Sequence, residues 1–282
     1  MIIFKKSKDL FRFLNSQKKE AKSVGFVPTM GALHRGHLSL LKECNEKANV
    51  SVCSIFVNPV QFNNPEDLKK YPKTISQDIE MLEENDCDVL FLPEEKEIYP
   101  DEASKQKHFQ LGDLERILEG KFRPGHFQGV CVVMEKLLNI VKPDLLFLGQ
   151  KDYQQCLVIK KLIEQLNLEV KIFVCPIVRE ESGLAMSSRN LRLDENDRKQ
   201  AAQLHKELEW INKNLRNQDF KILKEQAISR LEKNGFKVEY LELVKTSDLS
   251  SVPHYHENEE FILLIAAFIS GIRLIDNLLV KA

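Results

Sequence analysis

The sequence predicts an α/β fold: a Rossmann-like parallel sheet with helices on both faces, followed by a smaller C-terminal α+β domain. Over the first two thirds of the 282 residues, short continuous apolar runs alternate with helical patterns. Runs that are apolar on both faces are typical of parallel strands covered by helices. After about residue 190 the alternation stops, and charged helical patterns precede apolar strand patterns.

The expected strands are short and apolar, and the first two stop at a breaker. Val24 to Val27 ends at Pro28, and 50–57, which reads VSVCSIFV, ends at Asn58-Pro59. Proline and asparagine mark loops because they interrupt strand pairing or favour turns. Further strands are expected at 88–92, 145–148 and 170–177.

Helical patterns separate these strands and cover 38–48, 76–85, 127–141 and 154–166. The pattern in 127–141 has apolar residues at i, i+3, i+4, i+7, i+8 and i+11, which is one face of a helix. These residues are Val130, Val133, Met134, Leu137, Leu138 and Val141.

The C-terminal third has its own order of elements. One charged helix is expected from Asp194 to about Leu215, and a second from about Lys221 to Asn234. The segment 237–244 and two strands at 261–269 and 272–280 follow. We therefore divide the chain into domains 1–180 and 181–282.

Composition argues against several classes of protein. The chain has 41 Lys and Arg residues and 42 Asp and Glu residues. It therefore lacks the excess of basic residues that would indicate a nucleic-acid partner. The longest apolar run, 261–269, is too short for a membrane helix, and the charged N-terminus does not resemble a secretory signal. Six cysteines without a C-x-x-C pair indicate buried, reduced thiols. We expect a soluble, cytoplasmic protein that has no membrane partner.

Ligands of parallel α/β sheets bind beyond the carboxyl ends of the strands. The loops expected there are 28–37, 58–73, 149–153 and 178–190. The first contains His34-Arg35-Gly36-His37 at a strand-to-helix turn. A helix N-terminus attracts phosphate, glycines allow close approach, and two histidines add donors or charge. The plainer alternative is a helix cap with two surface histidines.

This H-x-G-H resembles the nucleotidylyltransferase and class I aminoacyl-tRNA synthetase superfamily. Its second signature, a K-M-S-K-S-type loop, resembles 186–190, which reads MSSRN. Taken alone, that loop is also an ordinary polar turn. The pair together predicts a bipartite ATP site.

Further motifs resemble the pantothenate synthetase family in order and spacing over nearly the whole chain. They are VPTMGALHRGH, SIFVNPVQF (54–62), EDLKKYPKT (66–74), RPGHFQGV (123–130), GQKDYQQ (149–155), GLAMSSRN (183–190) and RLIDN (273–277). The resemblance implies ATP-dependent condensation of pantoate with β-alanine to pantothenate. Pantoate first forms pantoyl adenylate and pyrophosphate, and the β-alanine amine then displaces AMP.

The resemblance also implies roles for individual residues. His34, His37, Lys151 and Arg189 are the expected catalytic residues, with His37 a proton donor and Lys151 stabilising charge on the α-phosphate. Gln61 and Gln155 are expected to bind pantoate, and Gln61 later β-alanine. The expected ATP-binding residues are Met30, Gly31, Ala32, Leu33, His34, Arg35, Gly36, His37, Gly149, Gln150, Lys151, Asp152, Val178, Met186, Ser187, Ser188 and Arg189. The 1–180 domain would then bind ATP and pantoate, and 181–282 would cover the active site.

Other expectations are less specific. Magnesium should accompany ATP, with unknown protein ligands. Asp78 is a possible contact, or else a helix cap or solvated charge. Arg123 and His126 form either a mobile cover or a helix-entry turn. The resemblance implies a homodimer, and strand 50–57 is a candidate contributor to it.

Two alternatives to a pantothenate synthetase stay open. One is another H-x-G-H nucleotidylyltransferase that acts on a phosphate substrate. The other is a nucleotide-binding protein that has lost catalysis.

Overall fold

The computed structural model describes residues 1–252, 255 and 259–280, and the chain forms two compact units. The N-terminal unit comprises Met1–Gln150 and Gln154–Pro176, and the C-terminal unit comprises Lys151–Tyr153 and Ile177–Ala282. The three residues 151–153 thus group with the C-terminal unit, although the elements on either side of them belong to the N-terminal one.

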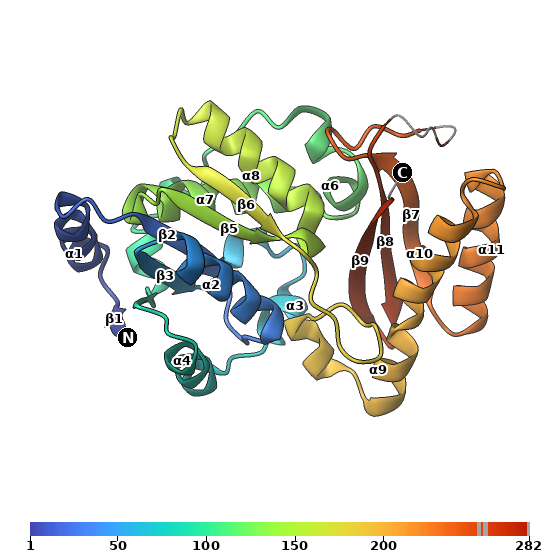
Figure 1. The fold of residues 1–282 in the computed structure, drawn as a ribbon, viewed down its shortest axis with the longest axis horizontal. Coiled ribbons are helices and arrows are strands. Elements are labelled where there is room, and N and C mark those ends of the chain that lie inside the picture. The colour runs from blue at the N-terminus through green and yellow to red at the C-terminus, as the bar shows by residue number, and fades with distance from the viewer. Residues whose placement is uncertain (253–254, 256–258, 281–282) are drawn as a thin grey trace. The chain divides into compact units, whose positions relative to one another are not determined.

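The N-terminal unit is built on a parallel sheet of six strands in the order β1-β4-β3-β2-β5-β6 (Figure 1). The strands are β1 Ile2–Phe4, β2 Val24–Thr29, β3 Val50–Ile55, β4 Val89–Phe91, β5 Leu145–Gly149 and β6 Lys171–Cys175. The order reverses at β2, since β3 and β4 extend the sheet to one side and β5 and β6 to the other. Ligands of such sheets bind at the carboxyl ends of the strands beside this reversal.

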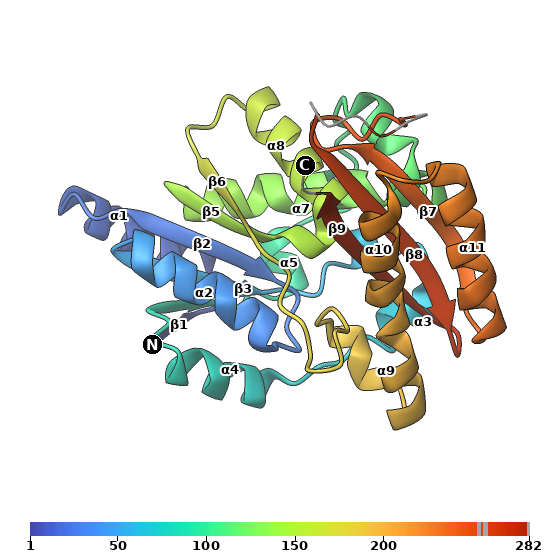
Figure 2. The ribbon, with the colours of Figure 1, turned by 45° about the vertical axis from the view of Figure 1, so that its right-hand side comes forward.

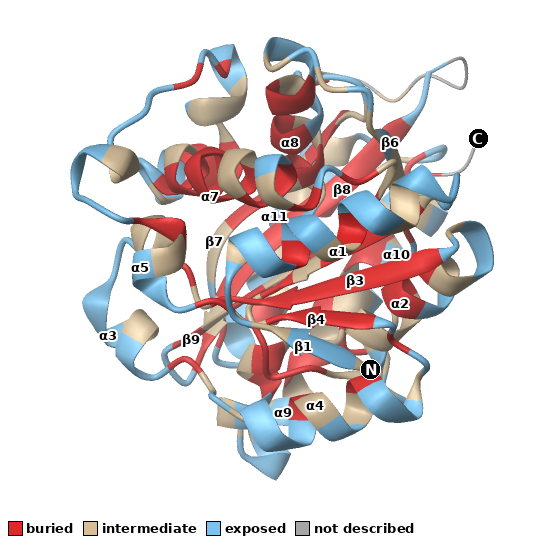
Figure 3. Cartoon of the chain, turned by 90° about the vertical axis from the view of Figure 1, so that its left-hand side faces the viewer, coloured by how far each residue is buried: buried red, intermediate tan, exposed pale blue. Residues whose placement is uncertain are grey.

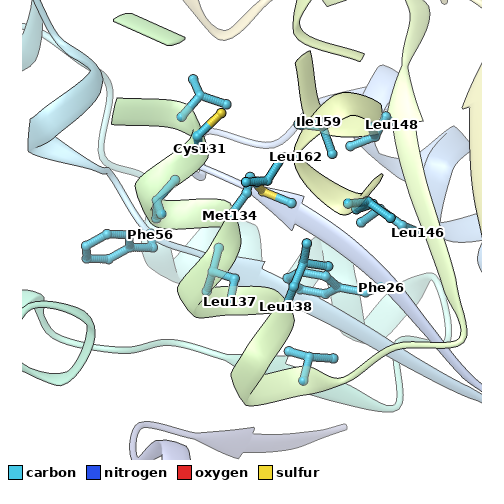
Figure 4. Packing of buried hydrophobic residues seen from close by; sticks show 14 of the residues in the cluster. Phe26, Phe56, Cys131, Met134, Leu137, Leu138, Leu146, Leu148, Ile159 and Leu162 are labelled. Atoms are coloured by element: carbon cyan, nitrogen blue, oxygen red, sulfur yellow. The ribbon is translucent and has the colours of Figure 1, made fainter. Parts of the chain in front are cut away.

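Successive residues of β2 face two different helix layers. Phe26 lies in a core with α1, α7 and α8, whereas Val27 lies in a second core with α2 and α4. Figure 4 shows the first core, with Met134 and Leu138 of α7 near Phe26 and Leu146. This period of two, repeated in β4 and β5, buries both faces of the sheet. The helices are α1 Ser7–Lys19, α2 Arg35–Lys47, α4 Ile75–Glu84, α7 His126–Val141 and α8 Tyr153–Gln165.

Short helices fill the connections of the same unit. The α-helical ones are α3 Pro65–Lys69, α5 Glu95–Ile98 and α6 Leu118–Phe122. The 3-10 turns of the chain are η1 Pro59–Gln61, η2 Ala103–Lys105, η3 Gly112–Glu115, η4 Gln150–Asp152 and η5 Ser188–Arg192.

The C-terminal unit is an antiparallel sheet of three strands with helices packed on it (Figure 2). The strands are β7 Lys237–Lys245, β8 Phe261–Ile269 and β9 Ile272–Val280, and the helices are α9 Glu195–Ala201, α10 Gln203–Asn214 and α11 Phe220–Lys233. The β8–β9 turn has φ of +48° at Ser270 and +75° at Gly271. Positive φ at both positions suits a two-residue hairpin turn and explains the glycine.

The predicted fold class is confirmed, and several boundaries move. Strand 24–27 continues to Thr29, because β2 pairs with β5 only at Gly25 and Phe26, so the missing N–H of Pro28 costs no pairing on that side. The helix expected at 38 begins at Arg35. The single helix expected from 194 to 215 is two helices, α9 and α10, that meet at Ala202. Strand β1 and helix α1 were not expected.

The expected contribution of strand 50–57 to a dimer is wrong for β3. This strand lies between β2 and β4, and all six of its residues are buried within the chain (Figure 3). All six cysteines are free and buried, as the sequence predicted. Among the described residues, no helix has both the length and the apolar character to cross a bilayer.

Candidate active site

The loop after β2 turns sharply before α2 begins. Gly31 and Ala32 both have positive φ, at +79° and +49°. The Thr29 hydroxyl accepts the Gly31 N–H at 3.2 Å and donates to the Ser54 carbonyl at 2.8 Å. A Cβ at residue 31 would lie 3.0 Å from Ile55. Space and backbone angle therefore both favour glycine here.

A buried carboxylate of α4 fixes the same loop. Asp78 is 1% exposed and accepts the N–H of Ala32 at 3.0 Å and that of Leu33 at 2.8 Å. The Thr74 hydroxyl donates to it at 3.0 Å. Both carboxylate oxygens are thus engaged by protein donors. Asp78 is neither a solvated charge nor presented as a magnesium ligand; it anchors the loop.

The H-x-G-H segment forms the start of α2. His34 is the N-cap residue, and its Nδ1 accepts the Gly36 N–H at 3.1 Å. A neutral His34 ring then carries its proton on Nε2. The His34 and His37 rings stack with centroids 4.0 Å apart, and Arg35 is exposed. The first turn contains no acidic residue, so the positive end of the helix dipole and two imidazoles stand together.

Gln61 ends the η1 turn that follows β3. Its Oε1 accepts from Nδ2 of Asn58 at 2.9 Å, and the Tyr99 hydroxyl donates to Oδ1 of Asn58 at 2.8 Å. This series of hydrogen bonds fixes the orientation of the Gln61 amide. Its Nε2 consequently lies 3.3 Å from Sδ of Met30, a weak acceptor. Two residues expected in the site are thus in contact, and Gln61 presents its donor end.

The first residues of α7 pack against η1. Gly129 approaches so closely that a Cβ there would lie 2.5 Å from the Val60 carbonyl oxygen, and its own carbonyl accepts from Asn58 at 3.1 Å. His126 is buried, and its Nδ1 lies 2.8 Å from the Gln61 carbonyl. Gly125, with φ of +81°, is the N-cap residue of α7. Of the two expectations for this motif, the helix-entry turn is the one that the geometry favours.

Sequence reasoning missed the supporting roles of Asn58 and Tyr99. Asn58 is 1% exposed, and burial of an amide requires hydrogen-bond partners. The available signal was the N-P pair after an apolar strand, which we interpreted only as a strand end. Tyr99 carries no local signal, because it lies 41 residues away along the chain.

The end of β5 and the elements after it contain three further expected residues, Gly149, Gln150 and Gln155. Gly149 faces open space, since a Cβ there would meet nothing within 4 Å, and Gln150 begins η4. Gln155 is half-buried on α8 and makes no side-chain hydrogen bond to the described residues. Its neighbour Gln154 is buried and binds the backbone of the segment 114–119. The two glutamines therefore differ, and Gln155 is the one whose amide is not used internally.

Lys151 and Asp152 complete η4 and belong to the C-terminal unit. Nζ of Lys151 lies 3.5 Å from Oδ2 of Asp152, and the side chains are 20% and 48% exposed. A long pair with that much exposure contributes little to stability. The lysine is held through its backbone, because its carbonyl accepts from Nδ2 of Asn277 at 3.0 Å.

The segment 178–190 of this unit is a hairpin-like turn that leads into η5. The Val178 carbonyl accepts the Met186 N–H at 3.0 Å, so the carbonyl of this expected ATP-binding residue already has one internal donor. Ser187 is the N-cap residue of η5, and its Oγ accepts the Arg189 N–H at 3.3 Å. Ser188 is buried, whereas Arg189 is half-buried. The expected ATP-binding residues Met186 to Arg189 thus share one compact turn.

No metal cluster is evident in the described part of the chain, and burial disfavours the thiolate form of four cysteines. No group of three or more His, Cys, Asp or Glu residues is arranged there to hold a metal ion. Burial raises the pKa of Cys44 and Cys131 to about 12, and that of Cys87 and Cys175 to about 11. Thiols with such pKa values are poor nucleophiles at neutral pH. Covalent catalysis by these cysteines is therefore disfavoured.

Comparisons with known proteins find matches over nearly the whole chain. A family model described as pantoate-β-alanine ligase matches residues 2–279. The pantothenate synthetase of Cytophaga hutchinsonii is 46% identical over 270 residues, which cover 95% of each chain. The crystal structure of pantothenate synthetase from Thermus thermophilus matches with a TM-score of 0.91, 35% identity and coverage of 100% of both chains.

A second solved structure carries ligands. It is a pantoate-β-alanine ligase from Francisella tularensis, complexed with "beta-gamma ATP" and β-alanine. It matches with a TM-score of 0.83 and 42% identity, and the match covers 99% of this chain and 97% of that one. Taken with the family model and the curated relative, these matches show that the chain belongs to the pantoate-β-alanine ligase family.

Proposed function

We propose that this chain condenses pantoate with β-alanine to pantothenate and uses ATP to do so. The observation that carries the proposal is the start of α2, where His34 and His37 stack beside the helix N-terminus. A site of this kind suits the charge that builds up on phosphate oxygens during adenylation. The identity of the substrates is taken from the relatives, which are named pantoate-β-alanine ligases.

The reaction has two balanced steps. The pantoate carboxylate attacks the α-phosphorus of ATP, the bond to the β-phosphate oxygen breaks, and pyrophosphate leaves. The neutral amine of β-alanine then attacks the acyl carbon of pantoyl adenylate, AMP leaves, and the amine loses a proton. Both steps need alignment and charge stabilisation rather than a covalent intermediate with the protein.

The N-terminal unit supplies groups for phosphate and for pantoate. We assign His34 and His37 to phosphate oxygens, with His37 able to donate a proton when it is protonated. Gln61 presents its Nε2 beside Met30, and this donor suits a carboxylate or hydroxyl oxygen of pantoate. Gln155 has no internal side-chain partner among the described residues and is assigned to pantoate as well.

The C-terminal unit supplies groups for the rest of ATP. We assign Lys151 to the α-phosphate and Asp152 to the ribose or to the lysine. Ser187 uses its oxygen as an acceptor within η5, so its hydroxyl hydrogen can be donated to a phosphate. We assign Ser187, Ser188 and Arg189, which share this turn, to the outer phosphates of ATP. The remaining ATP contacts are proposed for Met30 to His37, Gly149, Gln150, Val178 and Met186.

Magnesium, a homodimer, a cytoplasmic location and a C-terminal domain that covers the active site are parts of the same proposal. Because both oxygens of Asp78 are engaged by protein donors, magnesium would be carried chiefly by the ATP phosphates and water.

The test is an assay of AMP and pyrophosphate release in which each substrate is omitted in turn. Pyrophosphate should appear with ATP and pantoate alone, and pantothenate and AMP only after β-alanine is added. Pyrophosphate exchange that depends on a nucleoside monophosphate and not on pantoate would indicate a different nucleotidylyltransferase. ATP binding without AMP formation in the complete mixture would indicate a protein without catalytic activity.

A further inference from the structure

Two buried polar residues of β9 have no role in the function proposed above. Asp276 is 3% exposed and Asn277 is 1% exposed, and they lie in the R-L-I-D-N segment 273–277. Their partners across the sheet are Ile265 and Leu264, so their setting is apolar. Burial of a carboxylate and an amide is costly unless both are paired. Their hydrogen-bond partners therefore indicate what they do.

Asp276 forms a bidentate ion pair with Arg179. Nη1 and Nη2 of the arginine lie 2.7 and 2.9 Å from the two carboxylate oxygens. The same guanidinium donates to the Gly183 carbonyl at 3.1 Å and to the Asn277 carbonyl at 3.3 Å. One buried carboxylate thus fixes an arginine that closes the turn 179–183 upon itself.

This turn is the base of the segment assigned to the outer phosphates. The residues Arg179 and Ala185 form a bridge, and the Met186 N–H binds the Val178 carbonyl. Asn190 binds the Ala185 carbonyl through Nδ2 at 3.1 Å. Any movement of the Arg179 side chain would therefore be transmitted to Met186 and the residues after it.

Asn277 holds the other ATP-contacting segment of the unit. Its Nδ2 donates to the Lys151 carbonyl at 3.0 Å, and its N–H donates to Oδ1 of Asp276 at 2.7 Å. Lys151 has no comparable side-chain anchor, because its contact with Asp152 is 3.5 Å long and exposed. The backbone contact from β9 therefore fixes the point from which the lysine side chain extends.

We propose that Asp276 and Asn277 are positioning residues that hold Lys151 and the 186–189 turn at a fixed separation from each other. The two are neighbours on a strand paired with β8 along its whole length, which makes their spacing rigid. Two groups that act on different phosphates of one ATP need such a fixed separation. The inference rests on the proposed function, since it presumes that Lys151 acts on ATP.

The first experiment compares Asn277→Ala, Lys151→Ala and the double variant in pantoate-dependent pyrophosphate release. Asn277→Ala should lower kcat about 10- to 100-fold, with a smaller change in KM for ATP, because the lysine is displaced rather than removed. In the Lys151→Ala background the same change should cost less than about twofold, because residues that act through one another are not additive. Independent, multiplicative losses would overturn the role assigned to Asn277.

The second experiment uses Asp276→Asn, with Glu239→Gln as its matched control. Glu239 also binds an arginine of β9, since its Oε2 accepts from Arg273 at 2.6 and 2.9 Å, so the control removes a comparable carboxylate–arginine pair on the same sheet. Asp276→Asn should raise KM for ATP and lower kcat, whereas Glu239→Gln should leave both unchanged. Equal effects of the two changes would show a general loss of stability and overturn the role of Asp276.

Asp276→Asn removes the carboxylate partner of the half-buried Arg179 and can prevent folding. In that case Asn277→Asp, which keeps the shape but replaces the donor to Lys151 by an acceptor, takes its place; unchanged kcat in that folded variant overturns the proposal. The wild-type assay separates the two levels of inference. A wild type without pantoate-dependent pyrophosphate release would refute the proposed function itself, whereas an active wild type with unaffected β9 variants would refute only this inference.

Discussion

The carboxylate of Asp78 holds the backbone N–H of Leu33 at 2.8 Å, immediately before α2 begins. Its second oxygen holds the preceding N–H, that of Ala32, so two consecutive amides are fixed by one side chain. Ala32 has a φ of +49°, an angle that residues other than glycine seldom adopt. The buried contact stabilises that angle and thereby the position of His34.

Replacing Asp78 by asparagine should therefore impair adenylation. The variant keeps one acceptor, but its amide hydrogens would face the second backbone N–H. We expect kcat for pyrophosphate release to fall about tenfold or more through misplacement of His34. The free energy of unfolding should fall by about 1–3 kcal/mol through the lost charged hydrogen bond. Steady-state kinetics and denaturant unfolding measure the two effects.

A matched control for this prediction exists at another helix. Glu97 accepts the Ser7 N–H at 2.9 Å and the Ser7 hydroxyl at 2.5 Å at the start of α1, and these hydrogen bonds lower its pKa. Glu97→Gln should lose stability without a loss of kcat. If both variants lose activity in proportion to stability, Asp78 has no special effect on the site.

How far the sequence predicts this molecule depends on the range of the contacts. Apolar runs and the 127–141 pattern predict strands and helices because burial follows the local period. The H-x-G-H turn is equally local, since His34 caps the helix that it begins. Asp78 and Tyr99 act over 45 and 41 residues of sequence separation, and no local pattern reports such contacts. Their roles follow only from the folded structure.

The two functions of His34 can be separated by choosing the replacement. His34→Ala removes both the N-cap and the imidazole, whereas His34→Asn restores a good cap without the imidazole donor. If the ring stabilises charge on phosphate, both variants should lose about 100-fold or more in kcat. Melting temperatures should distinguish them, with the asparagine variant nearer to wild type. Recovery of activity in His34→Asn would reduce the residue to a cap.

Gln61→Ala should weaken the use of pantoate more than the binding of ATP. The variant removes a donor that Asn58 holds in one orientation, and loss of one such contact costs about tenfold in KM. Tyr99→Phe removes only the hydroxyl that supports Asn58, so it should shift KM for pantoate in the same direction by less. Substrate titrations of both variants measure this, and equal losses for pantoate and ATP would show that Gln61 lies elsewhere in the site.

Acidification should destabilise the protein through His205, which lies in the C-terminal unit. Burial and the Arg179 charge lower its pKa below the ordinary value of 6.5, against the opposing effect of Asp276 and Glu209. The unfolded chain therefore binds a proton at a higher pH than the folded one, so stability falls as the pH drops through about 6.5 and continues to fall until the folded state is also protonated. Melting temperatures between pH 7.5 and 5 should consequently fall less for His205→Gln than for the wild type. His108→Gln, at an exposed histidine, is the control and should follow the wild type. Parallel curves for wild type and His205→Gln would mean that His205 takes up its proton equally readily in the folded and unfolded chain.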